Sequence, residues 1–246
     1  MEKITSRQNG YIKRLRALAS NGELRRREGE FVCCGAKLFE EAVRYGGHIT
    51  SVLWRDEPKD TAEGLPPEQF CAPPELFDYA SPQKNSPGPV FTVKLPSLSA
   101  GEIRKAIVLQ GVQDPGNVGT VIRTASAFSM DAVVLTDGCA DPFSPKTVRA
   151  AMGATFRQKI IETGDVAGFL KANGLRMYGA ALSPRAMDIR KAGFEKTAVA
   201  IGSEGRGLSR EMLELCENEI IIPMAENCES LNAAAAAAVV MWEMSR

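Results

Sequence analysis

The sequence predicts an α/β protein of two domains, and three observations support that class. From Ala106 onward, short β-branched runs alternate with runs of helical period, which is typical of a mostly parallel sheet with helices on both faces. A stretch rich in Pro, Gly and Ser, from Glu57 to Pro96, separates this part from the residues before it. The length of 246 residues is enough for two modest domains. We therefore expect a smaller α/β domain over residues 1–98 and a larger α/β domain over residues 104–246.

The smaller domain begins with a basic amphipathic helix from Ser6 to Ala19, which carries Ile12, Leu15 and Leu18 on one side. The pattern then predicts a strand, a helix and a strand, at Glu30 to Val32, Ala36 to Arg44 and Ile49 to Trp54. The prolines between Glu57 and Pro96 argue against a helix of useful length in that stretch, whereas Val90 to Val93 fits a short strand.

The larger domain begins with a buried strand at Ala106 to Val112, identified by its length and β-branching. A helix follows from Val118 to Phe128, and its apolar stripe consists of Val118, Val121, Ile122 and Ala125. A further helix is expected at Pro145 to Met152, and six consecutive alanines, Ala233 to Ala238, predict a C-terminal helix. The remaining strands are expected at Ala132 to Leu135, Gln158 to Ile161, Arg176 to Ala181, Ala198 to Ile201 and Glu219 to Ile222.

The charges are balanced in number but not in position. Lys plus Arg and Asp plus Glu each total 30, so the net charge indicates no partner. Between Lys3 and Arg27, however, eight basic residues accompany one acidic residue, Glu23. This asymmetry predicts that the N-terminal part binds a polyanion.

The cysteines and the single histidine argue against a metal site or a disulfide framework. The six cysteines show no CxxC spacing, and His48 is the only histidine. We therefore expect reduced thiols and no metal. No apolar run is long enough to span a membrane, and MEKITSRQNG lacks the apolar core of a signal peptide, so a cytoplasmic location is expected.

A first cluster of interest, QDPGNVGTVIRTASAF, directly follows the first strand of the larger domain. Pro115 and Gly116 interrupt the chain, Asn117 is able to cap the helix, and Arg123 lies away from the apolar stripe. The plainer interpretation is a capped turn with a solvated arginine. The functional interpretation is an arginine at the carboxyl end of a parallel sheet, where such folds bind ligands.

Two further clusters follow late in the chain. AIGSEGRGLS, from Ala200 to Ser209, has the order G-x-x-G-x-G, so it matches neither a dinucleotide fingerprint nor a P-loop. Its glycines predict either a plain turn into a helix or a backbone that approaches a ligand. In IIIPMAENCESLNAAAAAA, Pro223 ends a strand and Ser230 or Asn232 is able to cap the alanine helix, which by itself fits a helix packed on the sheet.

Together, the clusters resemble the SpoU (TrmH) family of RNA ribose 2′-O-methyltransferases. The matching patterns are N-x-G-x-x-x-R at Asn117 to Arg123, G-S-E-G-x-G-L at Gly202 to Leu208, and I-P-M followed by S-L-N-A from Ile222 to Ala233. ITSRQNGYIKRLRAL and F-V-x-x-G-x-K-L at Phe31 to Leu38 are similar to the RNA substrate-binding domain that precedes many members. The resemblance implies a SPOUT domain with a deep C-terminal trefoil knot, a homodimer, and S-adenosylmethionine as methyl donor for an RNA ribose, with ribosomal RNA preferred over transfer RNA.

The resemblance also implies roles for individual residues. Arg123 would help to activate the 2′-hydroxyl, and Asn117 would position the segment that carries this arginine. The positions implied in cofactor binding are Leu182, Gly202, Ser203, Glu204, Gly205, Ile222, Met224, Ser230, Leu231 and Asn232. For RNA phosphates, the basic N-terminal part offers Lys13, Arg14, Arg25, Arg26 and Arg27.

Three positions depart from the family pattern, namely Cys34, Ala151 and Ser203. Two other classes of protein remain possible on the sequence. A binding-only RNA protein that kept the fold would be free to lose Asn117, Arg123, Glu204 and Asn232, all of which are present. A nucleotide-dependent enzyme of the doubly wound type should carry a phosphate-binding glycine turn after its first strand, which QGVQDPGNVG does not provide.

Overall fold

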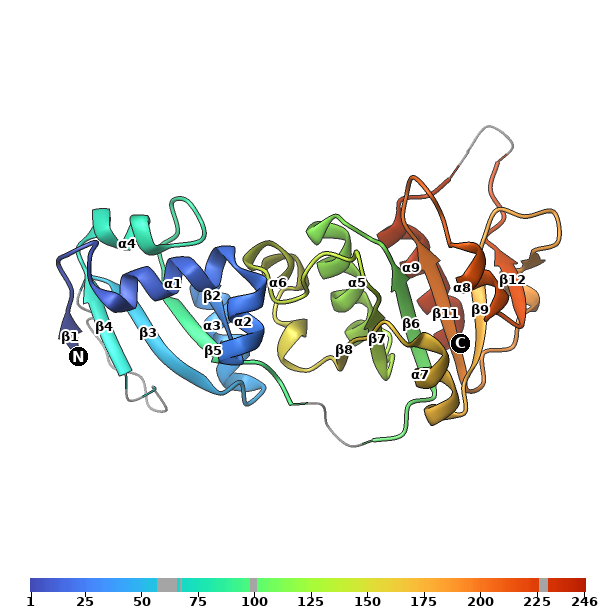
Figure 1. Ribbon diagram of the computed structural model, residues 1–246, viewed down its shortest axis with the longest axis horizontal. Helices are drawn as coiled ribbons and strands as arrows, with labels where there is room; N and C mark the ends of the chain where they lie inside the picture. The colour runs from blue at the N-terminus through green and yellow to red at the C-terminus, as the bar shows by residue number, and fades with distance from the viewer. Residues whose placement is uncertain (57–65, 67, 98–100, 226–229) are drawn as a thin grey trace. The chain divides into compact units, whose positions relative to one another are not determined.

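The chain folds into two compact units, seen in the computed structural model of Figure 1. The first unit comprises Met1–Ser97 and Phe143–Phe156, and the second comprises Leu98–Pro142 and Arg157–Arg246. The structure describes residues 1–56, 66, 68–97, 101–225 and 230–246. Part of the expected boundary near residues 96–104 lies outside the described residues.

The first unit contains a five-stranded mixed sheet with the strand order β1-β4-β3-β5-β2. Its strands are β1 (Glu2–Lys3), β2 (Glu30–Cys34), β3 (Ile49–Arg55), β4 (Glu68–Ala72) and β5 (Val90–Lys94). The β1–β4 and β4–β3 pairs are parallel, whereas β3–β5 and β5–β2 are antiparallel. The predicted strands at Glu30, Ile49 and Val90 are therefore present, each extended by one or two residues at its end.

Helices α1 (Gly10–Ser20) and α4 (Pro74–Ala80) pack with strands of this sheet around one hydrophobic core. Ile12, Leu15 and Leu18 are fully buried there, so the predicted apolar side of α1 is confirmed. Helix α1 begins later than predicted because the Asn9 side chain caps it by accepting from the Tyr11 backbone N–H. The other helices of the unit are α2 (Gly22–Glu28), α3 (Ala36–Arg44) and α6 (Pro145–Ala151), followed by the 3-10 turn η1 (Ala154–Phe156).

Two helices of the first unit differ from the sequence-based expectation. Helix α4 lies in the proline-rich stretch for which no useful helix was predicted, and its Pro74 occupies the first helical turn, where a missing N–H costs nothing. Helix α2 occupies the basic run and is capped at its start by Asn21, which accepts from Leu24 N at 3.0 Å. It ends at Gly29 with φ of 63°, a left-handed conformation that glycine adopts without strain.

The second unit contains a seven-stranded sheet with the order β10-β12-β9-β11-β6-β7-β8, in which every pair is parallel. Its strands are β6 (Lys105–Gln110), β7 (Ala132–Leu135), β8 (Ile160–Glu162), β9 (Arg176–Ala180), β10 (Met187–Asp188), β11 (Thr197–Gly202) and β12 (Asn218–Ile221). Strand β11 lies at the centre, paired in register with β6 on one side and β9 on the other. The predicted α/β class with a mostly parallel sheet is therefore confirmed.

Helices cover both faces of this sheet. Helices α7 (Val166–Asn173) and α8 (Arg210–Glu214) share a core with residues such as Ala106, Val108 and Ala200. Because side chains alternate along a strand, the residues between them, such as Ile107 and Leu109, face the opposite side. That side is covered by α5 (Pro115–Ala127) and α9 (Ala233–Ser245), which pack against each other and against the strands (Figure 1). The short turn η2 (Ile189–Lys191) completes the unit.

The start of α5 corrects one prediction. Pro115 and Gly116 do not interrupt the chain but form the first residues of the helix. The cap is Asp114 rather than Asn117, since its carboxylate accepts from Asn117 N at 2.8 Å. The Asn117 side chain is thereby left for other partners. Across the described ranges, none of the helices combines the length and apolar character needed to cross a membrane.

Candidate functional site

A pocket of about 340 Å³ opens at the carboxyl ends of β9, β11 and β12 in the second unit. This is the edge at which parallel α/β sheets bind ligands. Nine of the ten predicted cofactor positions line it, namely Leu182, Gly202, Ser203, Glu204, Gly205, Ile222, Met224, Ser230 and Leu231. Further lining comes from Ala180, Ala181, Arg206, Leu208, Ile220, Ala233 and Ala236. Three segments that are far apart in the sequence thus meet around one cavity.

The glycine-rich loop after β11 folds back tightly on itself. Gly207 N donates to Ser203 O at 2.9 Å, and Gly207 has a φ of +66°. A Cβ on Gly202 would lie 2.1 Å from the carbonyl carbon of Gly207, so only glycine fits at this position. A Cβ on Gly205 would meet nothing within 4 Å. Gly202 is therefore needed to close the loop, whereas Gly205 faces open space.

Asn117 connects the three clusters. Its side-chain amide donates to the Glu204 carboxylate of the glycine-rich loop. The side-chain oxygen of Asn117, Oδ1, accepts from Asn232 Nδ2 at 3.1 Å. Asn232 in turn caps α9, accepting from Ala234 N at 2.9 Å and Ala235 N at 3.3 Å. Asn232, the one predicted cofactor residue that does not line the pocket, therefore holds the start of α9 against the N-terminal turn of α5.

Gln110 anchors the far end of the glycine-rich loop, a role that sequence analysis missed. Its side chain donates to Ser209 Oγ at 3.0 Å and accepts from Ser209 N at 2.8 Å. Ser209 also caps α8. The sequence did contain a signal for this role. Gln110 ends an otherwise buried strand, and a polar side chain at such a position needs a hydrogen-bond partner.

Arg123 lies outside the pocket lining. It is exposed on α5, roughly 9 Å along the helix axis from Asn117. Among the described residues, its guanidinium has no hydrogen bond or ion pair. The prediction that it lies on the polar side of the helix is confirmed, and the group is available for a ligand that comes from outside this chain.

The alanine helix is closely packed on only part of its surface. Ala233, Ala234 and Ala237 are buried, whereas Ala235 is exposed and Ala236 is half-buried at the pocket. The exposed side of α9 also carries Val239 and Trp242, with exposed fractions of 40% and 56%. The Trp242 ring contacts Phe128 of the α5 end, edge to face, with centroids 5.7 Å apart.

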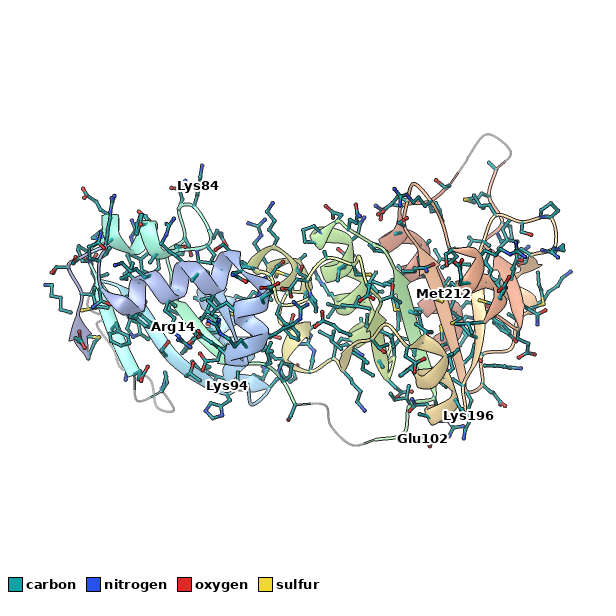
Figure 2. The ribbon with its side chains drawn as sticks, viewed as in Figure 1. Arg14, Lys84, Lys94, Glu102, Lys196 and Met212 are labelled. Atoms are coloured by element: carbon teal, nitrogen blue, oxygen red, sulfur yellow. The ribbon has the colours of Figure 1, made fainter. Side chains whose placement is uncertain are left out.

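In the first unit, several of the predicted RNA-contacting cations have internal partners. Arg14 binds Glu30, which also accepts from Lys94 Nζ at 2.7 Å. Figure 2 labels the two cations, Arg14 and Lys94. Burial acts to raise the pKa of Glu30, but hydrogen bonds from Lys94 and Arg14 outweigh it and hold that pKa below its usual value. Arg25 is buried and donates to Leu18 O. Arg14 and Arg25 are thus engaged in the fold.

The remaining predicted cations are exposed. Lys13, Arg26 and Arg27 all reach the solvent, and Arg27 lies 3.9 Å from Glu28, the outer limit of an ion pair.

The departures from the family pattern are accommodated locally. Cys34 Sγ lies 3.0 Å from Ser86 Oγ, Ala151 is buried, and Ser203 forms the bridge with Gly207.

The pocket has the chemistry that S-adenosylmethionine requires. Apolar side chains of Leu182, Met224 and Leu231 offer contacts for a flat aromatic ring. The glycine-rich loop brings backbone groups to the cavity, and Glu204 supplies a carboxylate for a cationic ligand. Nearby, burial raises the pKa of the Cys216 thiol to about 11, with a smaller contribution from the negative charge of Glu219, so this thiol stays neutral. Among the described residues, no cluster of His, Cys, Asp and Glu is arranged to hold a metal ion.

Comparison with known proteins agrees with this geometry. Residues 104–242 match the family described as "SpoU rRNA Methylase family". The chain is 33% identical over 249 residues to "23S rRNA (guanosine(2553)-2'-O)-methyltransferase RlmP" of Bacillus subtilis, covering 99% of each chain. It is 28% identical to "23S rRNA (uridine(2479)-2'-O)-methyltransferase" of Streptomyces viridochromogenes, covering 99% of this chain and 92% of that one.

A solved structure supports the same assignment. The SpoU methyltransferase AviRb from Streptomyces viridochromogenes, in complex with the cofactor AdoMet, superposes with a TM-score of 0.87 at 25% identity. The match covers 97% of this chain and 98% of that one, so it extends over both units. The family match over more than half of the chain, together with a full-length relative above 30% identity, leads to one conclusion: the chain belongs to the SpoU methyltransferase family.

Proposed function

We propose that this protein is an S-adenosylmethionine-dependent enzyme that methylates a ribose 2′-hydroxyl in ribosomal RNA. The observation that carries the proposal is that two separated motifs line one pocket at the ligand edge of the sheet, and that Asn117 of the third motif is hydrogen-bonded to both of them. The two relatives named above carry 23S rRNA in their names, one with a guanosine and one with a uridine. Ribosomal RNA is therefore preferred over transfer RNA.

In this proposal, the second unit holds the cofactor. Backbone groups from Gly202 to Gly207 and the side chains of Leu182, Met224 and Leu231 form its walls. When bound, the cofactor supplies a methyl group on a positively charged sulfur, which is already activated for transfer. The protein then has to position the acceptor, and positioning supplies a large part of the rate enhancement. Asn117 serves this purpose by holding Glu204 and Asn232 in fixed places.

Arg123 acts on the acceptor in this proposal. Its guanidinium is always protonated, so it does not serve as a base. With no partner among the described residues, the planar fork is free to bind an RNA phosphate next to the reacting ribose. The bound phosphate, or a water that it orients, takes the proton as the 2′-oxygen forms its new bond to the methyl carbon. The sulfur keeps the electron pair of the bond that breaks.

The proposal includes the assembly and the knot that the resemblance implies. Residues 1–98 act as an RNA substrate-binding domain and residues 104–246 as the methyltransferase domain, although Phe143–Phe156 of the latter belong to the first compact unit. The exposed Val239 and Trp242 on α9, next to Phe128, form an apolar surface that suits a second copy of the chain. The deep C-terminal trefoil knot rests on the family resemblance alone. An RNA substrate of this kind agrees with a cytoplasmic location.

Two measurements test the proposed function. Calorimetric titration should show S-adenosylmethionine binding to the isolated protein. Mapping of 2′-O-methyl positions in total RNA from cells with and without the gene should reveal one ribosomal position that depends on it. A dependent position in transfer RNA would replace the substrate, and cofactor binding without any dependent position would contradict the activity. A protein that binds RNA but not S-adenosylmethionine would be the non-catalytic alternative.

A further inference from the structure

Tyr79, near the end of α4, holds two arginine side chains. The Arg16 guanidinium of α1 lies 4.0 Å from the centroid of the Tyr79 ring, and that of Arg7 lies 4.5 Å from the same centroid. Arg16 also donates to the Tyr79 carbonyl oxygen at 2.6 Å. Cation–π contacts of this kind hold a guanidinium in place while its N–H groups remain available. The first unit thus presents two positioned positive charges close together.

In the described part of the chain, no carboxylate lies within ion-pair distance of these two charges. Neither Arg7 nor Arg16 forms an ion pair there, in contrast to Arg14 and Arg55, whose guanidiniums contact carboxylates. Glu75 lines the same recess as Arg7 without pairing with it. Because both arginines contact one ring, their charges are no farther apart than the sum of the two distances above, and they repel each other. A bound anion would remove this repulsion.

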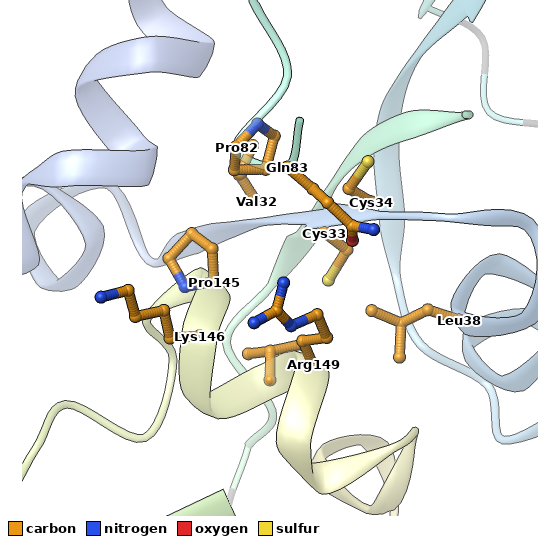
Figure 3. Close-up of a pocket in the computed structure, with 10 residues that line it drawn as sticks. Val32, Cys33, Cys34, Leu38, Pro82, Gln83, Pro145, Lys146 and Arg149 are labelled. Atoms are coloured by element: carbon orange, nitrogen blue, oxygen red, sulfur yellow. The ribbon is translucent and has the colours of Figure 1, made fainter. Parts of the chain in front are cut away.

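The same surface continues as a groove that leads to two further cations. The groove, of about 500 Å³, runs within the first unit from Arg16 to Lys146 and is lined by small groups, including the Ser20 and Ser81 hydroxyls. Beyond it, Lys146 and Arg149 of α6 lie beside the loop that contains Pro82 and Gln83 (Figure 3). In the described ranges, neither of these two cations has an ion-pair partner.

Helix α1 separates two kinds of cation by its own geometry. Lys13 and Arg16 are three residues apart and therefore share one side of the helix. Arg14 lies on a different side and is held by Glu28 and Glu30. The unpaired side of α1 is the one that carries the Tyr79 contact and borders the groove.

We propose that a single-stranded segment of the RNA substrate lies along this face, which comprises Arg7, Lys13, Arg16, Tyr79, Lys146 and Arg149. The inference rests on the proposed function and names the surface of the first unit that receives the RNA. The guanidinium forks of Arg7 and Arg16 bind backbone phosphates. The Tyr79 ring and the guanidiniums stacked on it are groups of the kind on which unpaired bases stack, which favours a single strand over a double helix.

The test measures binding of a fluorescent 12-nucleotide single-stranded RNA, at several salt concentrations, to the full chain and to the double variant Arg7→Gln/Arg16→Gln. Each phosphate contact on a single strand adds about 0.7 to the slope of log affinity against log salt. The variant should therefore lose about 0.7 for each arginine removed and bind roughly tenfold more weakly at low salt. Lys146→Gln/Arg149→Gln, which changes only exposed side chains, should lower the slope as well.

The matched control is Arg44→Gln/Arg104→Gln, which removes the same charge from exposed positions elsewhere. It should retain the parental slope. The inference is overturned if the Arg7/Arg16 variant is folded, as judged by thermal unfolding, and binds the strand as the parent does. It is also overturned if a hairpin duplex, but not the single strand, depends on these arginines. S-adenosylmethionine titration separates the two failures, since loss of cofactor binding in the parent contradicts the proposed function itself.

Discussion

The residues that stand out in the sequence are arranged in opposite ways in the two units of this protein. In the second unit, residues of two motifs line one pocket, and Asn117 of the third motif is hydrogen-bonded to both of them. In the first unit, the arginines that stand out in the sequence do not gather at one site. Arg14 is held by glutamates and Arg25 is buried, while the less noticeable Arg7 and Arg16 gather at Tyr79. The places of residues that shape the backbone were thus easier to predict from the sequence than the places of charged residues.

The largest expected effect tests the second unit. Gly202→Ala should abolish detectable S-adenosylmethionine binding and cost at least about 1–3 kcal/mol of stability, because the new Cβ would collide with the Gly207 backbone. Gly205→Ala is the matched control, since its Cβ would meet nothing within 4 Å. Calorimetry and thermal unfolding give both quantities. Equal cofactor affinity in the two variants would show that loop closure is not what shapes the pocket.

The contrast between the units also explains how much of the structure was predictable. Strand β7 and helix α3 begin and end where the local pattern predicts, because their burial depends on residues two to four positions apart. The ligand edge followed from the rule for parallel sheets. The partners of Arg14 did not follow, because Glu28 and Glu30 reach it only through tertiary packing. The Asp114 cap was missed because Asn117 is an equally good capping residue.

The second prediction concerns Arg123, the arginine of the first motif. Arg123→Lys should reduce methyl transfer at least roughly 100-fold, because a point charge does not reproduce the planar fork that binds a phosphate on two N–H groups. Cofactor affinity should stay at the parental value, since Arg123 does not line the pocket. The measurements are single-turnover methyl transfer and cofactor titration. Near-parental turnover by the lysine variant would remove Arg123 from the mechanism.

The third prediction distinguishes packing inside the chain from packing against a second copy. Ala237→Leu should cost about 1–3 kcal/mol, because Ala237 is fully buried and added methylene groups overpack the core. Ala235→Leu should cost only a few tenths of a kcal/mol in a monomer, since Ala235 is exposed. In a dimer formed through α9, Ala235→Leu should weaken association as well. Thermal unfolding and sedimentation decide between these outcomes, and a parental Ala237→Leu protein would contradict the packing of α9.

The fourth prediction sharpens the comparison within the basic run. Arg25→Gln should lower stability by about 2 kcal/mol, because it removes a buried charged donor to the Leu18 carbonyl. Arg27→Gln, three-quarters exposed on its side chain, should leave stability within about 0.5 kcal/mol. Chemical denaturation of the two variants measures the difference. Should the two arginines prove equally dispensable, the buried arrangement of Arg25 would have no energetic role.

The smallest effect concerns pH and the carboxylate that holds Arg14 in place. Hydrogen bonds from Lys94 and Arg14 keep the pKa of Glu30 below its usual value despite burial. A carboxylate with a lowered pKa in the folded state adds stability above its unfolded pKa, near 4.3, and loses it as the pH falls through the folded value. Glu30→Gln should therefore cost about 1 kcal/mol at pH 7, and the difference from the parent should shrink below about pH 4. Glu214→Gln, at an exposed ion pair with Arg210, is the control and should show little difference at either pH. If the stability difference between the parent and Glu30→Gln were the same at pH 7 and pH 3, the charge of Glu30 would not be what holds Arg14. That charge would then not distinguish Arg14 from the unpaired arginines beside Tyr79.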